Sequence, residues 1–258
     1  MADPTIVLVH GAFVDASSWR RVYAELAGDR LTIKAPPNPL CGTTEDAEYT
    51  RCVIEQVQGP VLLVGHSYGG AVITAAGVAD NVVGLVYVAG FAPDEGEDLD
   101  TLQSNFPAPA ASPYLKPSPL LDGSAEFTID PSGFHEAFCA DLPDAEAAFM
   151  AISQRPLAGV AFSEKAPTPA WRTRPSWAVL PAADRAIHPD VHRFSYDRML
   201  ATRYGIAAID LVHQGKFGQL VVLKGTTISS IPIADAIAKT RTVGEDLFDV
   251  IKGLQPKG

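Results

Sequence analysis

Short apolar runs alternate with amphipathic stretches over most of the chain. Three runs rich in β-branched residues, Thr5 to Val9, Val61 to Val64 and Val82 to Ala89, are typical of parallel strands that are buried on both faces. Between them, residues 17–26 and 44–57 carry apolar side chains at helical spacing. The alternation predicts an α/β fold with a mostly parallel sheet and helices on both faces.

Residues 93–174 interrupt this pattern. The segment is rich in proline and contains two amphipathic pieces, around residues 134–138 and 145–152, before a strand resumes at Trp177. A long insertion between two sheet strands predicts a helical lid over a binding site. We therefore expect a core formed by residues 1–92 and 175–258, with a lid domain over residues 93–174.

The end of the chain again reads as helix and strand. Tyr196 to His213 has Leu200, Tyr204, Ala207 and Leu211 on one face, which predicts a helix. A strand over residues 219–223 and two short helices, near residues 233–239 and 245–251, are expected to follow.

Composition narrows the class of protein. The 258 residues include 20 basic and 30 acidic side chains, a formal charge of −10, so a polyanion is repelled and nucleic acid is not an expected partner. Asp80 and Asn81 interrupt the apolar stretch that follows Ala71, which argues against a membrane span. Residues 1–9 lack the features of a signal peptide, so we expect a cytoplasmic protein.

The cysteines indicate neither a disulfide framework nor a metal site. Cys41, Cys52 and Cys139 are an odd number without CxxC or Cys/His ligand spacing. We expect reduced thiols, no metal and no cofactor.

The strongest chemical signal is the segment from Val61 to Gly70. A four-residue apolar run enters Gly65-His66-Ser67-Tyr68-Gly69, a GxSxG motif, and a run of small helix-forming residues follows. Strand, motif and helix together predict a nucleophile elbow, a sharp turn in which glycines permit the tight backbone and the serine hydroxyl is exposed. Ser67 is therefore the predicted nucleophile.

Acyl transfer by serine also needs oxyanion donors, a base and a carboxylate that orients the base. The amides of Tyr68, at the start of the elbow helix, and of Ala12, after the first strand, are the predicted oxyanion hole. Asp184 follows a later strand, at the carboxyl edge where ligand groups of parallel sheets gather. Taken without the elbow, a solvated loop aspartate is an equally good interpretation of Asp184. His10 and His66 lie in the same region, but we expect them to hold loops.

Four segments closely resemble the α/β hydrolase superfamily, in particular its short esterase and hydroxynitrile-lyase-like members. They are Leu8 to Phe13, Gly65 to Gly70, Val86 to Ala89 and Ala183 to Ile187. The resemblance covers about residues 1–194. It implies the α/β hydrolase fold, the nucleophile Ser67, the acid Asp184 and an oxyanion hole from Ala12 and Tyr68.

The base of that family is not found in its usual place. The family places a histidine shortly after a glycine that follows the final strand, and here Val221 to Gly225 is followed by Thr226 and Thr227. Threonine does not take up a proton at neutral pH. Four other histidines, His135, His188, His192 and His213, are candidates, but spacing places none of them beside Ser67.

From about Ser195 to the end, the chain resembles the carboxyl-terminal segment of bacterial phosphofructokinases. Tyr196 to Gly205 and Gly218 to Gly225 carry this likeness. The catalytic parts of those kinases lie upstream of this segment, so no kinase activity is expected from it. We therefore interpret the chain as a hydrolase-like part joined near Ser195 to an atypical tail over residues 195–258.

Two functions are compatible with these residues. The first is a cofactor-independent serine hydrolase that acts on a small, apolar ester or related acyl substrate, with activity reduced by the missing base. The second is a catalytically inactive hydrolase-fold protein that binds a small ligand in the same pocket, and Thr227 favours it. A fragment with a role related to phosphofructokinase is a third and weaker hypothesis. The sequence does not define the oligomeric state.

Overall fold

The computed structural model describes residues 3–28, 31–225 and 227–237. The chain divides into two compact units, Met1–Leu200 and Ala201–Gly258. The first unit contains the predicted elbow, the predicted oxyanion loop and Asp184.

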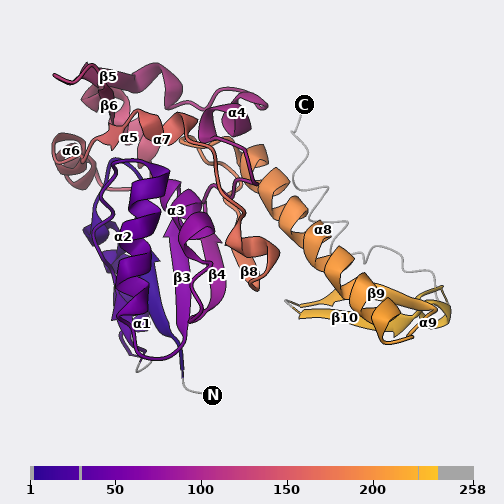
Figure 1. The fold of residues 1–258 in the computed structure, drawn as a ribbon. Helices are drawn as coiled ribbons and strands as arrows, with labels where there is room; N and C mark the ends of the chain where they lie inside the picture. Colours follow the sequence, from indigo (N-terminus) through magenta and orange to yellow (C-terminus); the bar gives the residue numbers. More distant parts are fainter. Residues whose placement is uncertain (1–2, 29–30, 226, 238–258) are drawn as a thin grey trace. The chain divides into compact units, whose positions relative to one another are not determined.

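The core of the first unit is a five-stranded sheet in the order β2-β1-β3-β4-β8, and every neighbouring pair is parallel (Figure 1). This confirms the predicted α/β class. The strands are β1 (Thr5–Val9), β2 (Ile33–Lys34), β3 (Val61–His66), β4 (Val82–Val88) and β8 (Ser176–Val179). Val9 pairs with Gly65 and His66 pairs with Val88, so β1, β3 and β4 end level with one another. The residues after these strands therefore meet at one edge of the sheet.

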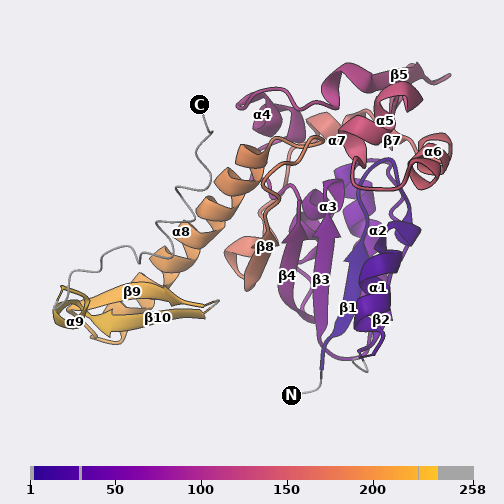
Figure 2. The ribbon, with the colours of Figure 1, turned by 180° about the vertical axis from the view of Figure 1, so that it is seen from behind.

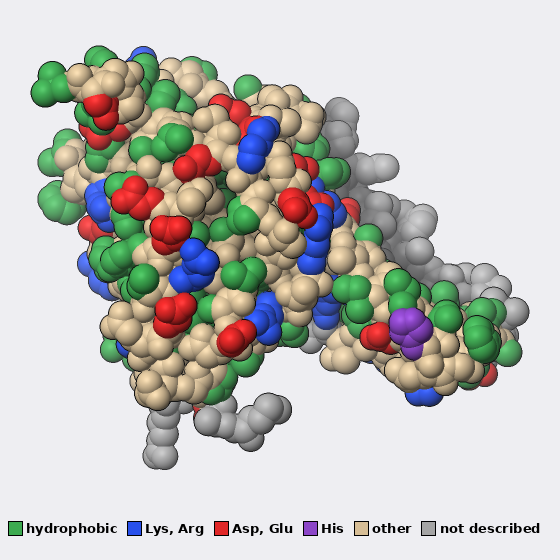
Figure 3. Space-filling model, viewed as in Figure 1, with side chains coloured by type: hydrophobic (Ala, Val, Ile, Leu, Met, Phe, Trp, Pro, Cys, Tyr) green, Lys and Arg blue, Asp and Glu red, His purple; other side chains and the backbone are tan. Residues whose placement is uncertain are grey.

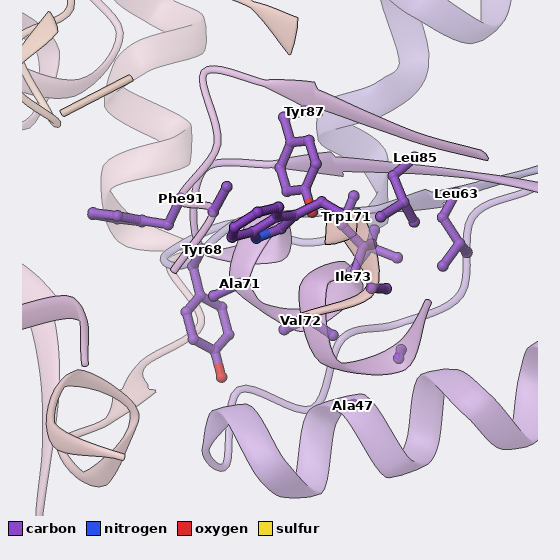
Figure 4. Packing of buried hydrophobic residues seen from close by; sticks show 14 of the residues in the cluster. Ala47, Leu63, Tyr68, Ala71, Val72, Ile73, Leu85, Tyr87, Phe91 and Trp171 are labelled. Carbon is purple, nitrogen blue, oxygen red and sulfur yellow. The ribbon is translucent and has the colours of Figure 1, made fainter. Parts of the chain in front are cut away.

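Both faces of the sheet are covered, as the unbroken apolar runs predict. Val7 and Val9 of β1 belong to the large core cluster, whereas Ile6 and Leu8 pack with Trp19 on the other face. Figure 4 shows the side chains of the elbow helix α3 (Tyr68–Ala76) packed among residues of β3, β4 and α2 (Thr43–Glu55). This packing fixes the helix that follows Ser67.

The N-terminal helices start close to their predicted positions. Ala16–Trp19 is a 3-10 turn, η1, that leads into α1 (Arg20–Leu26). The start of α2 differs by one residue: its cap is Gly42, at φ 141°, and the Thr44 amide donates to the Glu164 carboxylate at 3.1 Å. A carboxylate from another part of the chain thus accepts an amide of the first turn of α2.

The lid segment is only partly helical. Its two predicted amphipathic pieces are α5 (Pro131–Phe138) and α6 (Asp144–Ile152), and Figure 2 shows them gathered with α4 (Leu99–Ser104) and α7 (Val160–Ser163) at one end of the sheet. The 3-10 turns η2 (Ser112–Tyr114) and η3 (Ala170–Arg172) belong to the same segment. Three antiparallel strands add a small sheet that the sequence pattern does not predict: β5 (Leu115–Pro119), β6 (Ala125–Ile129) and β7 (Leu157–Ala158).

The C-terminal helix and strand form where the sequence predicts them, and a strand that is not predicted follows. The predicted helix is longer, α8 (Pro189–His213), with proline at its first position, where its missing N–H costs nothing. β9 (Gln219–Lys224) pairs with the unpredicted strand β10 (Thr227–Pro232) in a two-stranded antiparallel sheet. The short helix α9 spans Ile233–Ile237, and the helix predicted near residues 245–251 lies outside the described residues.

On the face that Figure 3 presents, acidic and basic side chains of the first unit are interspersed. Neither sign forms a continuous tract on that face. Among the helices in the described part of the chain, none is long and apolar enough to cross a membrane.

Candidate active site

Ser67 occupies a strained turn between β3 and α3. Its φ of 52° and ψ of −122° lie in a region that side-chain-bearing residues rarely adopt. Backbone hydrogen bonds hold the turn: the Ser67 amide donates to Val88 at 3.2 Å, and the amides of Gly70 and Phe91 donate to the Ser67 carbonyl at 2.9 and 3.1 Å. The half-buried serine therefore has the geometry of a nucleophile elbow.

The loop after β1 lies directly against this turn. A Cβ on Gly11 would stand 2.8 Å from the Ser67 Cβ, so the loop can approach this closely only with glycine there. Ala12, the next residue, lines the same cavity as Ser67 and Tyr68. Because Tyr68 is the first residue of α3, its amide has no acceptor within the helix and stands at the positive end of the helix dipole. The two residues whose amides are the predicted oxyanion hole therefore line one cavity.

His10 holds the position of this loop. Its Nδ1 donates to the Gly11 carbonyl at 2.8 Å, and its Nε2 accepts the Asn38 amide at 2.9 Å. These two partners require the neutral ring, and burial lowers the pKa of His10, which favours the same form. His10 therefore serves the loop, as expected from sequence.

A buried carboxylate that the sequence pattern does not single out fixes Tyr68, the residue after Ser67. The Tyr68 hydroxyl donates to Asp46 Oδ2 at 2.7 Å, and Asp46 also accepts the amides of Leu40 and Cys41. Asp46 is fully buried, and burial raises its pKa even though these hydrogen bonds act in the opposite direction. Burial likewise raises the pKa of Tyr68, which keeps its hydroxyl a donor. The network ties the start of α3 to α2.

Replacing Tyr68 with phenylalanine is expected to destabilise the protein by about 1–3 kcal/mol, because Asp46 loses its side-chain donor while it remains buried. Urea denaturation followed by circular dichroism measures this change. Tyr49→Phe is the matched control, since Tyr49 is exposed, and it is expected to stay within about 0.5 kcal/mol of the wild type. Equal stability of the two variants would show that the Asp46 contact contributes nothing.

Ser67 lines a largely apolar cavity of about 250 Å³, to which residues of the predicted lid segment also contribute. Aromatic and aliphatic side chains from both the core and the lid line this cavity, among them Phe91, Leu99, Ile129, Phe138, Leu157 and Phe162. The few polar groups include Asp100 and Gln103 of α4. The space suits a small apolar group next to the nucleophile.

A second cavity, of about 300 Å³, brings Ser67 together with Asp184. His66 also lines it, and burial lowers the pKa of His66 to about 4, so this ring is neutral at pH 7. Asp184 Oδ1 accepts the amides of Ala186 and Ile187 at 2.8 and 3.1 Å. Ser67 and Asp184, the predicted nucleophile and acid, therefore line one cavity.

The partner of Asp184 is His192, at 3.0 Å between Nε2 and Oδ2. Burial of Asp184 opposes ionisation, but the hydrogen bonds from His192, Ile187 and Ala186 outweigh it, and the pKa of Asp184 lies below its ordinary value. The side chain of His192 is only 1% exposed, and its Nδ1 has no hydrogen-bond partner among the described residues. His192 does not line either cavity at Ser67. His192 therefore bonds the Asp184 carboxylate from outside these cavities.

Replacing Asp184 with asparagine is expected to cost about 1–3 kcal/mol of stability at pH 7, because asparagine has one acceptor oxygen where the carboxylate uses two. With that oxygen on the Ala186 and Ile187 amides, an NH2 group replaces Oδ2 and cannot accept the His192 N–H. A lowered folded-state pKa stabilises the protein above the unfolded pKa of about 3.9, and this contribution is lost as pH falls through the folded value. The difference between wild type and Asp184→Asn should therefore shrink below about pH 4. Urea denaturation at pH 7 and pH 3 measures it, and a constant difference would contradict this assignment.

The remaining histidines have other partners or other locations. His135 Nε2 bonds the Leu142 carbonyl at 2.9 Å within the lid, and His188 stacks on Phe106. His213 is the last residue of α8, and Thr227 is exposed at the start of β10. Among the described residues, none forms a side-chain hydrogen bond with the Ser67 hydroxyl.

A parallel sheet whose third strand ends in a strained serine that is followed by a helix is the arrangement of the nucleophile-elbow class of proteins. The sequence profile of the alpha/beta hydrolase family matches residues 6–225, and the chain belongs to that family. This confirms the resemblance seen in the sequence.

Solved structures share the fold. Polyneuridine aldehyde esterase superposes with a TM-score of 0.66 at 16% identity, covering 77% of this chain and 88% of its own. A pyrethroid hydrolase superposes with a TM-score of 0.62 at 21% identity, covering 75% of this chain and 84% of its own. An extracellular alpha/beta-hydrolase from a Paenibacillus species superposes with a TM-score of 0.60 at 20% identity, covering 75% of this chain and 86% of its own. These likenesses support a hydrolase scaffold.

Curated relatives match a short segment only. The chain is 47% identical over 57 residues to a pyrophosphate–fructose 6-phosphate 1-phosphotransferase of Streptomyces coelicolor, which is 22% of this chain and 17% of that protein. An ATP-dependent 6-phosphofructokinase of Mycobacterium bovis is 46% identical over 55 residues, 21% of this chain and 16% of its own length. The chain thus spans about a sixth of these relatives. The partial match agrees with a chain of two origins.

Proposed function

We propose that this protein is a serine hydrolase that cleaves a small, apolar carboxylic ester through an acyl-enzyme on Ser67. The observation that carries the proposal is the strained turn that presents Ser67 to an apolar cavity lined by Ala12 and Tyr68. The Ser67 oxygen attacks the ester carbonyl, and the amides of Ala12 and Tyr68 stabilise the negative charge on the carbonyl oxygen. Asp184 supplies negative charge on the other side of the serine.

The shape and chemistry of the apolar cavity support a small substrate. Its volume of about 250 Å³, bounded by Leu99 and Phe162 of the lid, suits a short acyl or alkoxy group. The names of two structural neighbours, polyneuridine aldehyde esterase and pyrethroid hydrolase, point to the same reaction class.

The proton of the Ser67 hydroxyl has no side-chain acceptor within the described residues. Without a general base, catalysis loses a contribution of about 10²- to 10⁴-fold. Activated esters lessen this need, because a good leaving group departs without a proton. We therefore expect slow turnover and a long-lived acyl-enzyme, since deacylation also requires a base to activate water.

The test uses p-nitrophenyl acetate, butyrate and decanoate. We expect intact-mass spectrometry to show one acyl group per chain with the two short esters and much less with decanoate, which exceeds the cavity. Absence of any adduct, together with hydrolysis no faster than in buffer, would contradict the proposed function.

A second candidate is a catalytically inactive protein that binds a small apolar ligand in the same cavity. It is favoured by the Ser67 hydroxyl, which has no side-chain partner among the described residues, and by Thr227, a threonine where the family has its base histidine. A non-hydrolysable ketone analogue of the butyrate ester separates the two: binding without acylation by the ester supports the inactive protein.

A further inference from the structure

We propose that the cavity bounded by His66, Ser67 and Asp184 binds a free, neutral nitrogen base of the imidazole class, which performs the proton transfer that no histidine of the described chain performs. The inference rests on the proposed function, because the bound base acts on Ser67. It assigns to this protein a second, small-molecule ligand besides the ester.

The walls of the cavity offer both partners that such a ring needs. An imidazole has one nitrogen that accepts a proton and one N–H that donates. Ser67 contributes a hydroxyl and Asp184 a carboxylate to the same space. Asp184 Oδ1 already accepts two amides, whereas Oδ2 accepts one hydrogen bond, from His192, and has capacity for a further one.

The charges around the cavity favour the cation that forms during proton transfer. Asp184 is ionised at neutral pH, because its pKa is lowered, and Asp141 is a second carboxylate on the wall. His66, the histidine on the wall, is neutral at pH 7 and does not repel an imidazolium. This is the arrangement of a buried carboxylate that stabilises an imidazolium in a complete triad.

The space is large enough for the ring. A cavity of about 150 Å³ accommodates benzene, and this cavity holds about 300 Å³. Val14, Leu142 and Met150 form an apolar part of the wall, against which a planar ring can pack.

The proton balance closes at each step. The bound base takes the Ser67 proton as the Ser67 oxygen bonds to the ester carbonyl carbon, and it returns that proton to the leaving alkoxide. In deacylation, the base takes a proton from water as the water oxygen attacks the acyl carbon. It then returns this proton to the Ser67 oxygen, which releases the carboxylic acid and restores the free base.

The experiment titrates imidazole into the protein with p-nitrophenyl butyrate. We expect the rate to rise at least about tenfold and to saturate, because general-base catalysis contributes about 10²–10⁴ when the base is held in place. In Ser67→Ala, the rate should rise only linearly, as it does for imidazole in buffer. Pyrazole, a ring of the same size but far less basic, should compete with imidazole without raising the rate. A linear response in the wild type would overturn the inference.

Filling the cavity provides a second test. Cys139 lines it, and Cys139→Phe should abolish saturation, whereas Cys139→Ala should retain the imidazole response. Leu142→Trp serves the same purpose where Cys139→Phe does not fold, since Leu142 is a half-buried wall residue.

Ligand-observed NMR with imidazole distinguishes failure of this inference from failure of the proposed function. Acylation of the wild type by the butyrate ester without saturable imidazole binding overturns the inference alone. Imidazole binding that is lost in Cys139→Phe, with no acylation under any condition, overturns the proposed function and leaves the ligand site in place.

Discussion

Replacing Ser67 with alanine is expected to abolish acyl-enzyme formation with p-nitrophenyl butyrate and to lower ester turnover to the level that binding and the oxyanion donors supply. The reason is geometric: Ser67 lies on a turn of φ 52° and lines the apolar cavity together with Ala12 and Tyr68. Loss of the covalent adduct is all-or-none, since alanine has no nucleophilic oxygen. Intact-mass spectrometry after incubation with the ester measures it.

The expected fall in turnover is smaller than the loss of the adduct. In complete triads, removing the serine costs about 10⁶-fold and leaves about 10³–10⁴ over water. Members of a triad act as a unit, so a site without its base has already lost much of what the serine provides. The control is Ser163→Ala, an exposed serine of α7 that lines neither cavity at Ser67. An adduct that persists in Ser67→Ala would place the nucleophile elsewhere.

The elbow could be predicted from sequence because its signal is local. Val61 to Gly70 contains the strand, the two glycines and the start of the helix within ten residues, and the strained φ of Ser67 follows from that succession. The carboxyl-edge position of Asp184 was equally predictable, since parallel strands end at the same edge. The structure brings Asp184 to the same cavity as Ser67, but the catalytic roles of the two residues stay predictions.

Two buried residues of the site could not be identified in this way because their roles depend on distant contacts. Asp46 is one of many acidic residues in the sequence, and its hydrogen bond with Tyr68 joins residues 22 positions apart. His192 was considered as a base because it follows Asp184 closely. Because α8 starts at Pro189, His192 instead bonds Asp184 Oδ2 and lines neither cavity at Ser67. The spacing of residues in the sequence does not predict which way this side chain points.

β5 and β10, which the sequence pattern does not predict, form by pairing with other strands of the chain. β5 contains two prolines, which argue against a strand, but it is an edge strand of the small sheet, where proline is tolerated. For β9 the strand itself was correctly predicted, and its antiparallel partner β10 was not predicted. An apolar run indicates that a strand forms but not which strand pairs with it; Gly225, at φ 60°, precedes the segment Thr227–Pro232 that pairs back on β9.

Replacing Gly69 with alanine is expected to destabilise the first unit by about 3 kcal/mol or more and to eliminate ester turnover. Helix propensity alone predicts the opposite sign, because alanine is better than glycine within a helix by about 1 kcal/mol. Steric conflict outweighs this preference, because a Cβ on Gly69 would stand 2.5 Å from the Val9 carbonyl oxygen and 2.8 Å from that of His10. Both atoms are backbone, so the conflict cannot be relieved by rotating a side chain.

Relief requires α3 to move away from the end of β1, and this movement separates the Tyr68 amide from the Ala12 amide. Stability and catalysis are therefore expected to fall together, measured by urea denaturation and by hydrolysis of p-nitrophenyl butyrate. Gly28→Ala is the control, since a Cβ there meets no atom within 4 Å, and it should stay within about 0.5 kcal/mol of the wild type. A Gly69→Ala variant with unchanged stability and turnover would mean that β1 and α3 approach less closely than described, and the oxyanion hole built on that approach would have to be abandoned.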